Sequence, residues 1–209
     1  MRDKPAASYR GLVMEEQGEP EQIRNYLSDT ERRLLEALNL SRDILDLPVP
    51  GRWTIGQIAR HLIMSERVMY PLWTVLPKLR RWPGLMQQMD RSNVALWHLM
   101  GMRTVEPPHS KAMAGYATEG RLRAPMFLRP AARSTNYATL IASRRRMRDR
   151  TLAAVAELDA KTLRTLRWSH PEMGSLTLME MFRFLGVHEE HHLPQIQRIR
   201  AEWKVNAGQ

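Results

Sequence analysis

The sequence contains no cysteine, and this absence excludes both disulfides and thiolate ligands. A bound transition metal would therefore have to be held by histidine, aspartate or glutamate. No stretch approaches about 18 consecutive apolar residues, the length that a membrane-spanning helix needs. Residues 1–20 are polar and lack the apolar region of a secretory signal. We therefore expect a cytoplasmic protein without a membrane segment.

Lysine is also scarce, so the net charge of +10 comes almost entirely from arginine. A strong basic balance can indicate nucleic-acid binding. The densest basic run is Arg144, Arg145, Arg146, Arg148 and Arg150. It lies in a helical pattern without interleaved aromatic residues or a recognised DNA- or RNA-reading motif. The run therefore favours a solvated helix face over a nucleic-acid interface.

The 209 residues, 43% hydrophobic and 26% charged, are typical of one soluble globular domain. Apolar residues recur with helical periodicity in four long segments. These segments are about 21–46, 54–79, 134–158 and 177–203. Two of them begin with capping-box spacing, Thr54 with Gln57 and Thr177 with Glu180, which predicts where these helices start. We expect an all-α protein with four principal helices, arranged up and down or with one long crossover.

The rest of the chain carries weaker patterns. Residues 1–20 are expected to form a flexible tail, and 21–205 the helical domain. Residues 82–133 form an insertion and long loop between the second and third main helices, in which 84–102 could form a short amphipathic helix. No alternation typical of β-strands was evident.

The chemistry is concentrated in histidines. His188 and His192 are four residues apart, so on a helix both rings project from one face. The same face continues through apolar residues, so the pattern places both rings in the core. A buried imidazole costs free energy unless its nitrogens are satisfied, and one shared metal would satisfy both. His61 likewise interrupts an inward stripe. Three converging imidazoles with an open coordination position are typical of a catalytic metal site.

Other interpretations remain open at this point. A single histidine such as His61 can be an ordinary hydrogen-bonded core residue. Residues 188–192 also match the H-E-x-x-H pattern of zinc peptidases, but no histidine follows His192 to provide a third ligand, and no sheet is predicted. His191 is rotated by about 100° from His192, so we expect it beside the site or at the surface. His98, His109 and His170 stay unassigned.

Two blocks of sequence resemble the DinB-like (DinB/YfiT) superfamily of four-helix-bundle metalloproteins. The first, 51–66, contains a tryptophan, a helix start and His61. The second, 170–195, contains a glycine before the helix, the paired His188 and His192, and a trailing Gln195. Weaker similarities lie at 124–130 and at Arg148. Together they extend over about 21–203.

The resemblance implies a divalent ion, commonly zinc or nickel, bound by His61, His188 and His192. It also implies a homodimer. Some relatives transfer low-molecular-weight thiols such as bacillithiol or mycothiol, others are isomerases, and many are described as metal-dependent hydrolases without a substrate. The insertion sets this chain apart from the shortest members and leaves its substrate open.

The leading hypothesis is a metal-dependent transferase or hydrolase that acts on a small molecule, with a thiol as a candidate cosubstrate. Glu66, Glu189 and Gln195 are candidates to orient imidazoles or move a proton. Arg129 and Arg148 are candidates to hold an anionic cosubstrate. The first alternative is a non-catalytic metal-binding or interaction module. Nucleic-acid binding is the weaker alternative.

Overall fold

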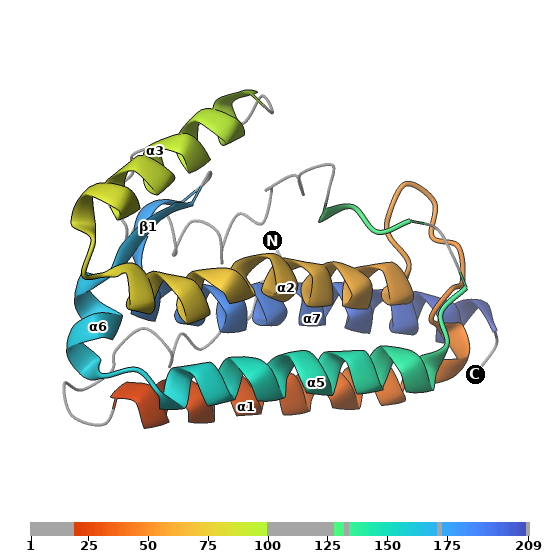
Figure 1. Cartoon of the computed structure of the whole chain (residues 1–209). Coiled ribbons are helices and arrows are strands. Elements are labelled where there is room, and N and C mark those ends of the chain that lie inside the picture. Colours follow the sequence, from red (N-terminus) through yellow and green to blue (C-terminus); the bar gives the residue numbers. More distant parts are fainter. Residues whose placement is uncertain (1–18, 100–127, 132–133, 171–172, 208–209) are drawn as a thin grey trace, which may run out of the picture.

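Four long helices form the body of the computed structural model, which describes residues 19–99, 128–131, 134–170 and 173–207 (Figure 1). The long helices are α1 (Glu19–Asn39), α2 (Ile55–Leu79), α5 (Tyr137–Ala156) and α7 (Leu178–Asn206). The shorter elements are the 3₁₀ turn η2 (Arg42–Ile44), the helices α3 (Pro83–Leu99) and α6 (Ala160–Thr165), and the strands β1 (Arg167–His170) and β2 (Gly174–Thr177). The expected all-α four-helix bundle is confirmed.

Each long helix packs against two others: α1 against α5 and α7, and α2 against α5 and α7. The colour gradient in Figure 1 shows that α2 and α5 run in the same direction. The chain must therefore return along the bundle between them, which is a long crossover rather than a simple up-and-down order. Helix α3 lies in this crossover, where the sequence predicts an amphipathic helix.

Both expected capping boxes are present. The Thr54 hydroxyl accepts a hydrogen bond from the Gln57 amide at 3.1 Å, and the Gln57 side chain accepts one from the Thr54 amide at 2.9 Å. Thr177 and Glu180 form the same pair at 3.1 and 2.7 Å. Each pair satisfies two backbone donors that the first helical turn leaves free. These caps fix the starts of α2 and α7, which carry the histidines.

The first helix is shorter than predicted, because it ends at Asn39 rather than near residue 46. The chain then turns through η2, which allows Ile44 and Leu45 to be buried. Next to this turn, Gly56 donates to the carbonyl of Leu45 at 2.7 Å, and a side chain at position 56 would collide with Thr135. The close approach explains the glycine at the start of α2.

The expectation of no strands was wrong, since β1 and β2 form a two-stranded antiparallel hairpin. Each strand has four residues, which is too short for a recognisable alternation of burial. Ser169 of β1 is held by Asp90 and Asn93 of α3 through hydrogen bonds of 2.8 to 2.9 Å. The hairpin therefore anchors α3 and leads directly into the cap of α7.

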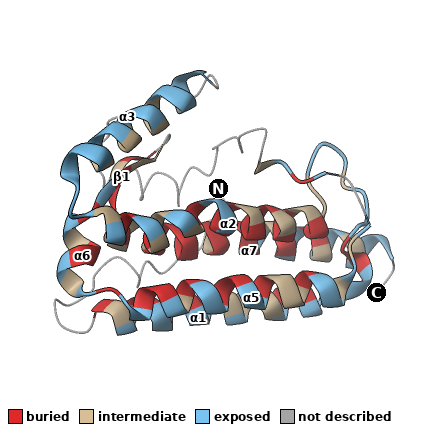
Figure 2. Cartoon of the chain, in the orientation of Figure 1, coloured by how far each residue is buried: buried red, intermediate tan, exposed pale blue. Residues whose placement is uncertain are grey.

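Figure 2 shows that the buried faces of the long helices are turned toward one another. The apolar side chains form two separate clusters. One surrounds Trp73 and Phe182, and the other surrounds Leu34 and Ile58. No helix in the described part of the chain is long and apolar enough to cross a membrane. Residues 1–18 of the predicted tail lie outside the described residues, whereas Glu19 and Pro20 begin α1. Of the predicted insertion and loop 82–133, residues 100–127 and 132–133 also lie outside the described residues.

Candidate metal centre

His61 of α2 and His188 and His192 of α7 meet inside the bundle. All three side chains are buried, and each offers a ring nitrogen within 4.8 Å of the other two. The Nε2 atom of His188 lies 3.1 Å from Nε2 of His61 and 3.1 Å from Nε2 of His192. The structure thus brings together the three residues that the sequence singled out.

The remaining ring contacts determine which nitrogens carry protons. The Nδ1 atom of His61 lies 2.9 Å from the carbonyl oxygen of Leu128, which can only accept, so this Nδ1 carries the hydrogen. The Nδ1 atom of His192 donates in the same way to Oε1 of Gln195 at 3.0 Å. A neutral imidazole has a single N–H. The Nε2 atoms of His61 and His192 therefore both present lone pairs toward Nε2 of His188.

This arrangement cannot be satisfied by hydrogen bonds among the three rings. If Nε2 of His188 carries a hydrogen, it can donate well to one neighbour and leaves the other lone pair unmatched. If it carries none, three lone pairs face one another. Buried polar groups without partners are costly, whereas a cation at this point would accept all three lone pairs. The donor set therefore fits a metal ion.

Burial keeps the three imidazoles in the neutral form that can bind a metal ion. It lowers the pKa of His61 and His188, and it lowers the pKa of His192 to about 3. The neighbouring imidazoles lower the pKa of His188 and His192 further. All three rings are therefore neutral at pH 7, and neutral imidazole is the form that binds metals.

Aromatic side chains hold the rings in place. Trp53 packs on His61 with ring centroids 4.9 Å apart, and Phe184 stacks on His188 at 5.6 Å. His170 lies against Phe184 at 5.0 Å. His191 packs edge-on against His192 and lies 3.0 Å from the Gln195 amide nitrogen. Thus His191 lies beside the site, as its helical position indicates; His98 is exposed on α3 and His109 lies outside the described residues.

A second buried polar group lies close to the histidines, since its Glu189 directly follows His188. Arg144 binds Glu66 and Glu189, and Arg148 binds Glu189 and lies 3.4 Å from Glu66. The Nε atom of Arg144 lies 3.6 Å from Glu31. These five residues, called the ion cluster below, come from all four long helices. In each helix they lie between residues of the two apolar clusters, so the ion cluster separates the two halves of the core.

The ion cluster has three carboxylates and two guanidinium groups, so full ionisation would leave one surplus negative charge. Burial tends to raise the pKa of Glu66, but Arg148 and Arg144 outweigh it and the pKa is lowered. Burial raises the pKa of Glu31 to about 7, against the opposing charge of Arg144. Glu31 makes the longest ion pair of the three carboxylates, and its protonation below about pH 7 balances the charges.

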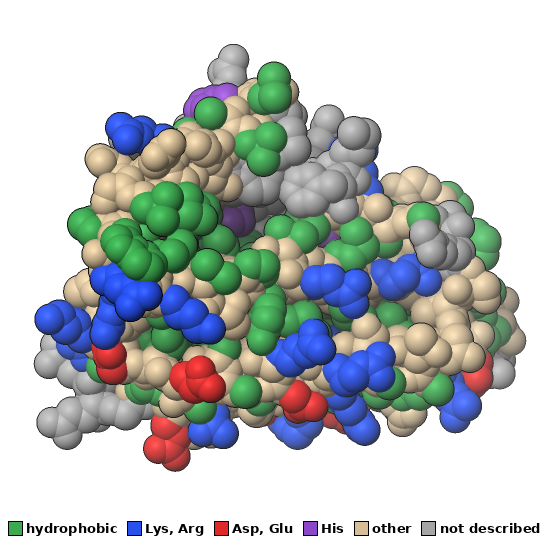
Figure 3. All heavy atoms as spheres, in the orientation of Figure 1, with side chains coloured by type: hydrophobic (Ala, Val, Ile, Leu, Met, Phe, Trp, Pro, Cys, Tyr) green, Lys and Arg blue, Asp and Glu red, His purple; other side chains and the backbone are tan. Residues whose placement is uncertain are grey.

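The ion cluster corrects three expectations. Arg144 and Arg148 do not belong to a solvated face, because their exposed fractions are 1% and 0%, although Arg145, Arg146 and Arg150 are exposed. The basic run therefore has fewer arginines at the surface than the sequence suggests. Figure 3 shows basic and acidic side chains interspersed along the face that carries α1 and α5. Both observations weaken the nucleic-acid interpretation.

The other two corrections concern the candidate roles. Glu66 and Glu189 are bound by arginines rather than by the imidazoles. Arg148 is fully buried, so it is not available to an anionic cosubstrate, and Arg129 is exposed beside Leu128. Gln195 does contact His192, as its candidate role requires. Leu128 was missed, because a backbone carbonyl in a loop leaves no signal in the sequence.

The sequence model of the DinB superfamily matches residues 26–196. The chain belongs to the DinB superfamily. The match includes all of α2 and α5, most of α1 and α7, the three histidines and the ion cluster. No curated protein sequence matches the chain.

A solved structure shows the same fold. YfiT from Bacillus subtilis, described as a probable metal-dependent hydrolase with an unusual four-helix bundle topology, has a TM-score of 0.55 to this chain. The similarity covers 94% of this chain and 93% of YfiT, at 18% sequence identity. This DinB superfamily member thus has the fold of YfiT over nearly its whole length.

Proposed function

We propose that this DinB superfamily protein is a metal-dependent hydrolase or thiol-dependent transferase, in which His61, His188 and His192 hold one divalent ion. The single observation that carries the proposal is the convergence of three Nε2 atoms, two of which must present lone pairs. The described function of YfiT as a probable metal-dependent hydrolase supports it. Zinc and nickel are the proposed ions, since both suit neutral imidazole ligands.

Three neutral ligands would leave the ion its full charge, which lowers the pKa of a bound water or thiol and polarises a bound oxygen. The residues of the chain have supporting tasks. Leu128 and Gln195 fix the tautomers of His61 and His192 by accepting their Nδ1 hydrogens. The chain has no cysteine, so a reacting thiol would come from a cosubstrate.

The arginines of the ion cluster support the centre by linking the helices that carry it. Arg144 joins Glu66 of α2 to Glu189 of α7, and these two helices carry the three histidines. Glu189 directly follows His188 in the chain. The ion cluster therefore ties the two helices together at the level of the site, which holds the imidazoles at a fixed separation.

The proposal is tested first by metal content. Protein purified without an affinity tag should contain one zinc or nickel ion per chain by elemental analysis, and His61→Ala and His192→Ala should abolish this content. His98→Ala, which changes an exposed histidine on α3, is the matched control and should retain the ion. Wild-type protein without a stoichiometric ion, or retention of the ion in both site variants, would contradict the metal centre.

Catalysis is tested separately. The metal-loaded protein is assayed with a panel of activated esters and amides, and with low-molecular-weight thiols paired with electrophiles. Turnover that is lost in His61→Ala and kept in His98→Ala supports the enzyme. Stoichiometric metal without any turnover that depends on His61 would contradict the catalytic half of the proposal and favour a non-catalytic metal-binding module.

The cellular location and the assembly are proposals of the same kind. We propose that the protein is cytoplasmic and that it is a homodimer, the latter as the family resemblance implies. Light scattering coupled to size-exclusion chromatography should give twice the chain mass of 24.3 kDa, and a single-chain mass at micromolar concentration would contradict the dimer.

A further inference from the structure

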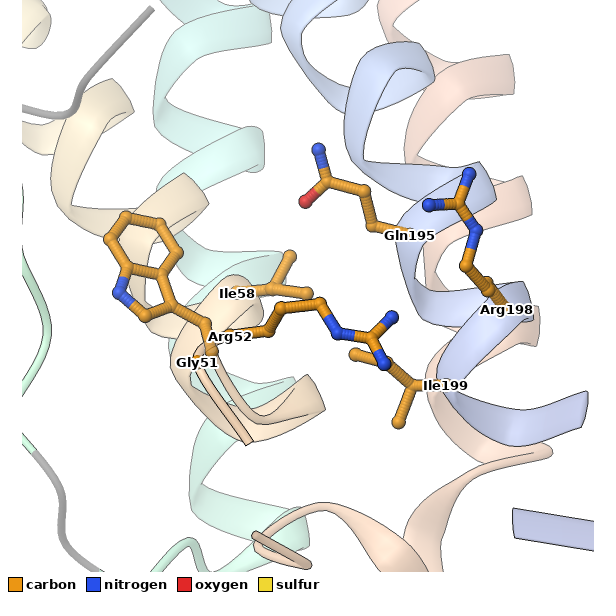
Figure 4. A pocket seen from close by; sticks show the side chains of 7 residues that line it. Gly51, Arg52, Ile58, Gln195, Arg198 and Ile199 are labelled. Carbon is orange, nitrogen blue, oxygen red and sulfur yellow. The ribbon is translucent and has the colours of Figure 1, made fainter. Parts of the chain in front are cut away.

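A pocket of about 550 Å³ lies between the turn before α2 and the second half of α7, within the size range of small-molecule sites (Figure 4). It is lined by Gly51, Arg52, Trp53, Ile58, Gln195, Arg198 and Ile199. Two of these residues also touch the candidate metal centre. Trp53 packs on the His61 ring, and Gln195 accepts the hydrogen of His192. A molecule in the pocket would therefore contact the two side chains that hold the rings of His61 and His192.

The lining has an apolar part and a cationic part. Ile58 and Ile199 are buried and Trp53 provides an aromatic surface. The lining residues include two arginines and no carboxylate. Figure 4 shows the guanidinium groups of Arg52 and Arg198 on the same side of the pocket. The pocket thus suits a molecule with an apolar body and an anionic end.

The charges around the two arginines indicate the net charge of the anion that the pocket would bind. Arg52 makes a two-pronged ion pair with Glu202, at 2.7 and 3.1 Å, just outside the pocket lining. This hydrogen bonding lowers the pKa of Glu202, and the charge of Arg198 lowers it further. Among the described residues, Arg198 donates no hydrogen bond to a partner. Two guanidinium groups and one carboxylate leave a single positive charge, which a monoanion would balance.

We infer that this pocket binds the carboxylate end of a small aromatic or branched apolar monoacid, whose other end lies against Trp53 and Gln195, the neighbours of the three-histidine centre. The inference rests on the proposed function, because it names the class of substrate for the same site. Arg198 is the residue available to receive the carboxylate, since a guanidinium group can donate two parallel hydrogen bonds to its oxygens. A dianion such as a phosphate monoester would exceed the net charge of Arg52, Arg198 and Glu202 at this end of the pocket.

The test uses benzoate, its neutral isostere benzamide and the dianion phenylphosphonate, each titrated by calorimetry into the metal-loaded protein at low salt. Benzoate should bind more tightly than both other probes. Arg198→Gln should weaken benzoate roughly tenfold and change benzamide by less than about twofold. Arg198→Lys, which keeps the charge but loses the fork, should give an intermediate affinity. Thermal unfolding checks that each variant is folded.

The control is Arg145→Gln, which removes an exposed arginine on α5 away from the pocket. Equal weakening in Arg145→Gln would show a general attraction to the basic protein and overturn the inference. Equal binding of benzoate and benzamide, or tighter binding of phenylphosphonate, would also overturn it. Unchanged benzoate affinity in Arg198→Gln would place the carboxylate elsewhere, such as on a metal ion. This result would also overturn the inference.

The titrations are repeated on the His61→Ala variant, which separates this inference from the proposed function. If the protein binds no metal but benzoate affinity still depends on Arg198, the pocket assignment holds and the metal centre fails. If metal binds as proposed and benzoate does not depend on Arg198, the metal centre holds and the pocket assignment fails.

Discussion

The bundle buries two polar groups at the same level, and they differ in how their charges and lone pairs are matched. In the ion cluster, two arginines and three glutamates bind one another, so opposite charges are matched within the chain. In the three-histidine centre, the rings present like groups to one another, and at least one lone pair has no hydrogen. The first group matches its charges within the chain, although some of its buried oxygen and nitrogen atoms have no hydrogen-bond partner. The second group has no opposite charge within the chain, so a cation from outside would have to match its lone pairs.

The difference separates a structural role from a functional one. A buried ion pair contributes little net stability over apolar residues, but removal of one partner leaves a buried charge without compensation. A buried set of unmatched lone pairs lowers stability unless a ligand binds. We therefore expect the ion cluster to control the stability of the bundle and the histidines to control the affinity for metal.

The largest effect is expected in the ion cluster. Arg144→Met leaves Glu66 and Glu189 with one arginine fewer, so the free energy of unfolding should fall by about 3–5 kcal/mol in urea titrations. Arg145→Met, one position along α5 and exposed, should change it by less than about 0.5 kcal/mol. A loss below about 1 kcal/mol for Arg144→Met would show that the ion cluster does not hold the helices together.

The three-histidine centre differs from the ion cluster, because its contribution to the free energy of unfolding depends on an added ion. Zinc at 100 times its dissociation constant should stabilise the wild-type protein by about 2.7 kcal/mol. His192→Ala should abolish this gain while leaving the metal-free protein about as stable as wild type. Differential scanning calorimetry with zinc and with a chelator measures both. The same gain from zinc in His192→Ala would contradict the assigned ligands.

A pH titration tests the surplus charge of the ion cluster. The pKa of Glu31 is raised from 4.5 to about 7 in the folded protein, so its contribution to stability is complete below about pH 4.5 and is lost as the pH rises through about 7. Relative to Glu31→Gln, the wild-type protein should lose on the order of 2 kcal/mol across this interval. A pH-independent difference between the two proteins would contradict the charge balance described for Glu31.

The smallest expected effect concerns the support of a single imidazole. Gln195→Leu removes the acceptor that fixes the His192 tautomer, so zinc affinity should fall roughly tenfold in competition with a chelating dye. Gln197→Leu, an exposed neighbour on α7, is the matched control and should leave the affinity unchanged. Equal zinc affinities in the two variants would show that Gln195 does not support the metal site.

The sequence predicted those features that depend on local spacing. Thr54 with Gln57 and Thr177 with Glu180 mark helix starts because a capping box is complete within four residues. His188 and His192 were found because polar residues on an apolar stripe need a partner. The same reasoning applies to Arg144, Arg148 and Glu66, which also lie on inward stripes, but their charge suggested a surface location. Charged residues on an inward stripe of several helices at once could have indicated an ion cluster.

Other features depend on distant parts of the chain meeting. The carbonyl of Leu128 reaches His61 across 67 positions of sequence, and no side-chain pattern marks it. The β1–β2 hairpin is too short to show a period, and Asp90 and Asn93 of α3, which are distant in the sequence, hold its Ser169 by hydrogen bonds. The pocket combines the turn before α2 with the second half of α7, so Arg198 gained its candidate role only from the fold.

X-ray absorption spectroscopy of the zinc-loaded protein tests the central claim most directly, because it reports the atoms that surround the ion. We predict three imidazole nitrogens at about 2.0–2.1 Å together with at least one oxygen, and one imidazole fewer in His61→Ala. A spectrum without imidazole scattering, or one that His61→Ala leaves unchanged, would contradict a metal centre shared by α2 and α7.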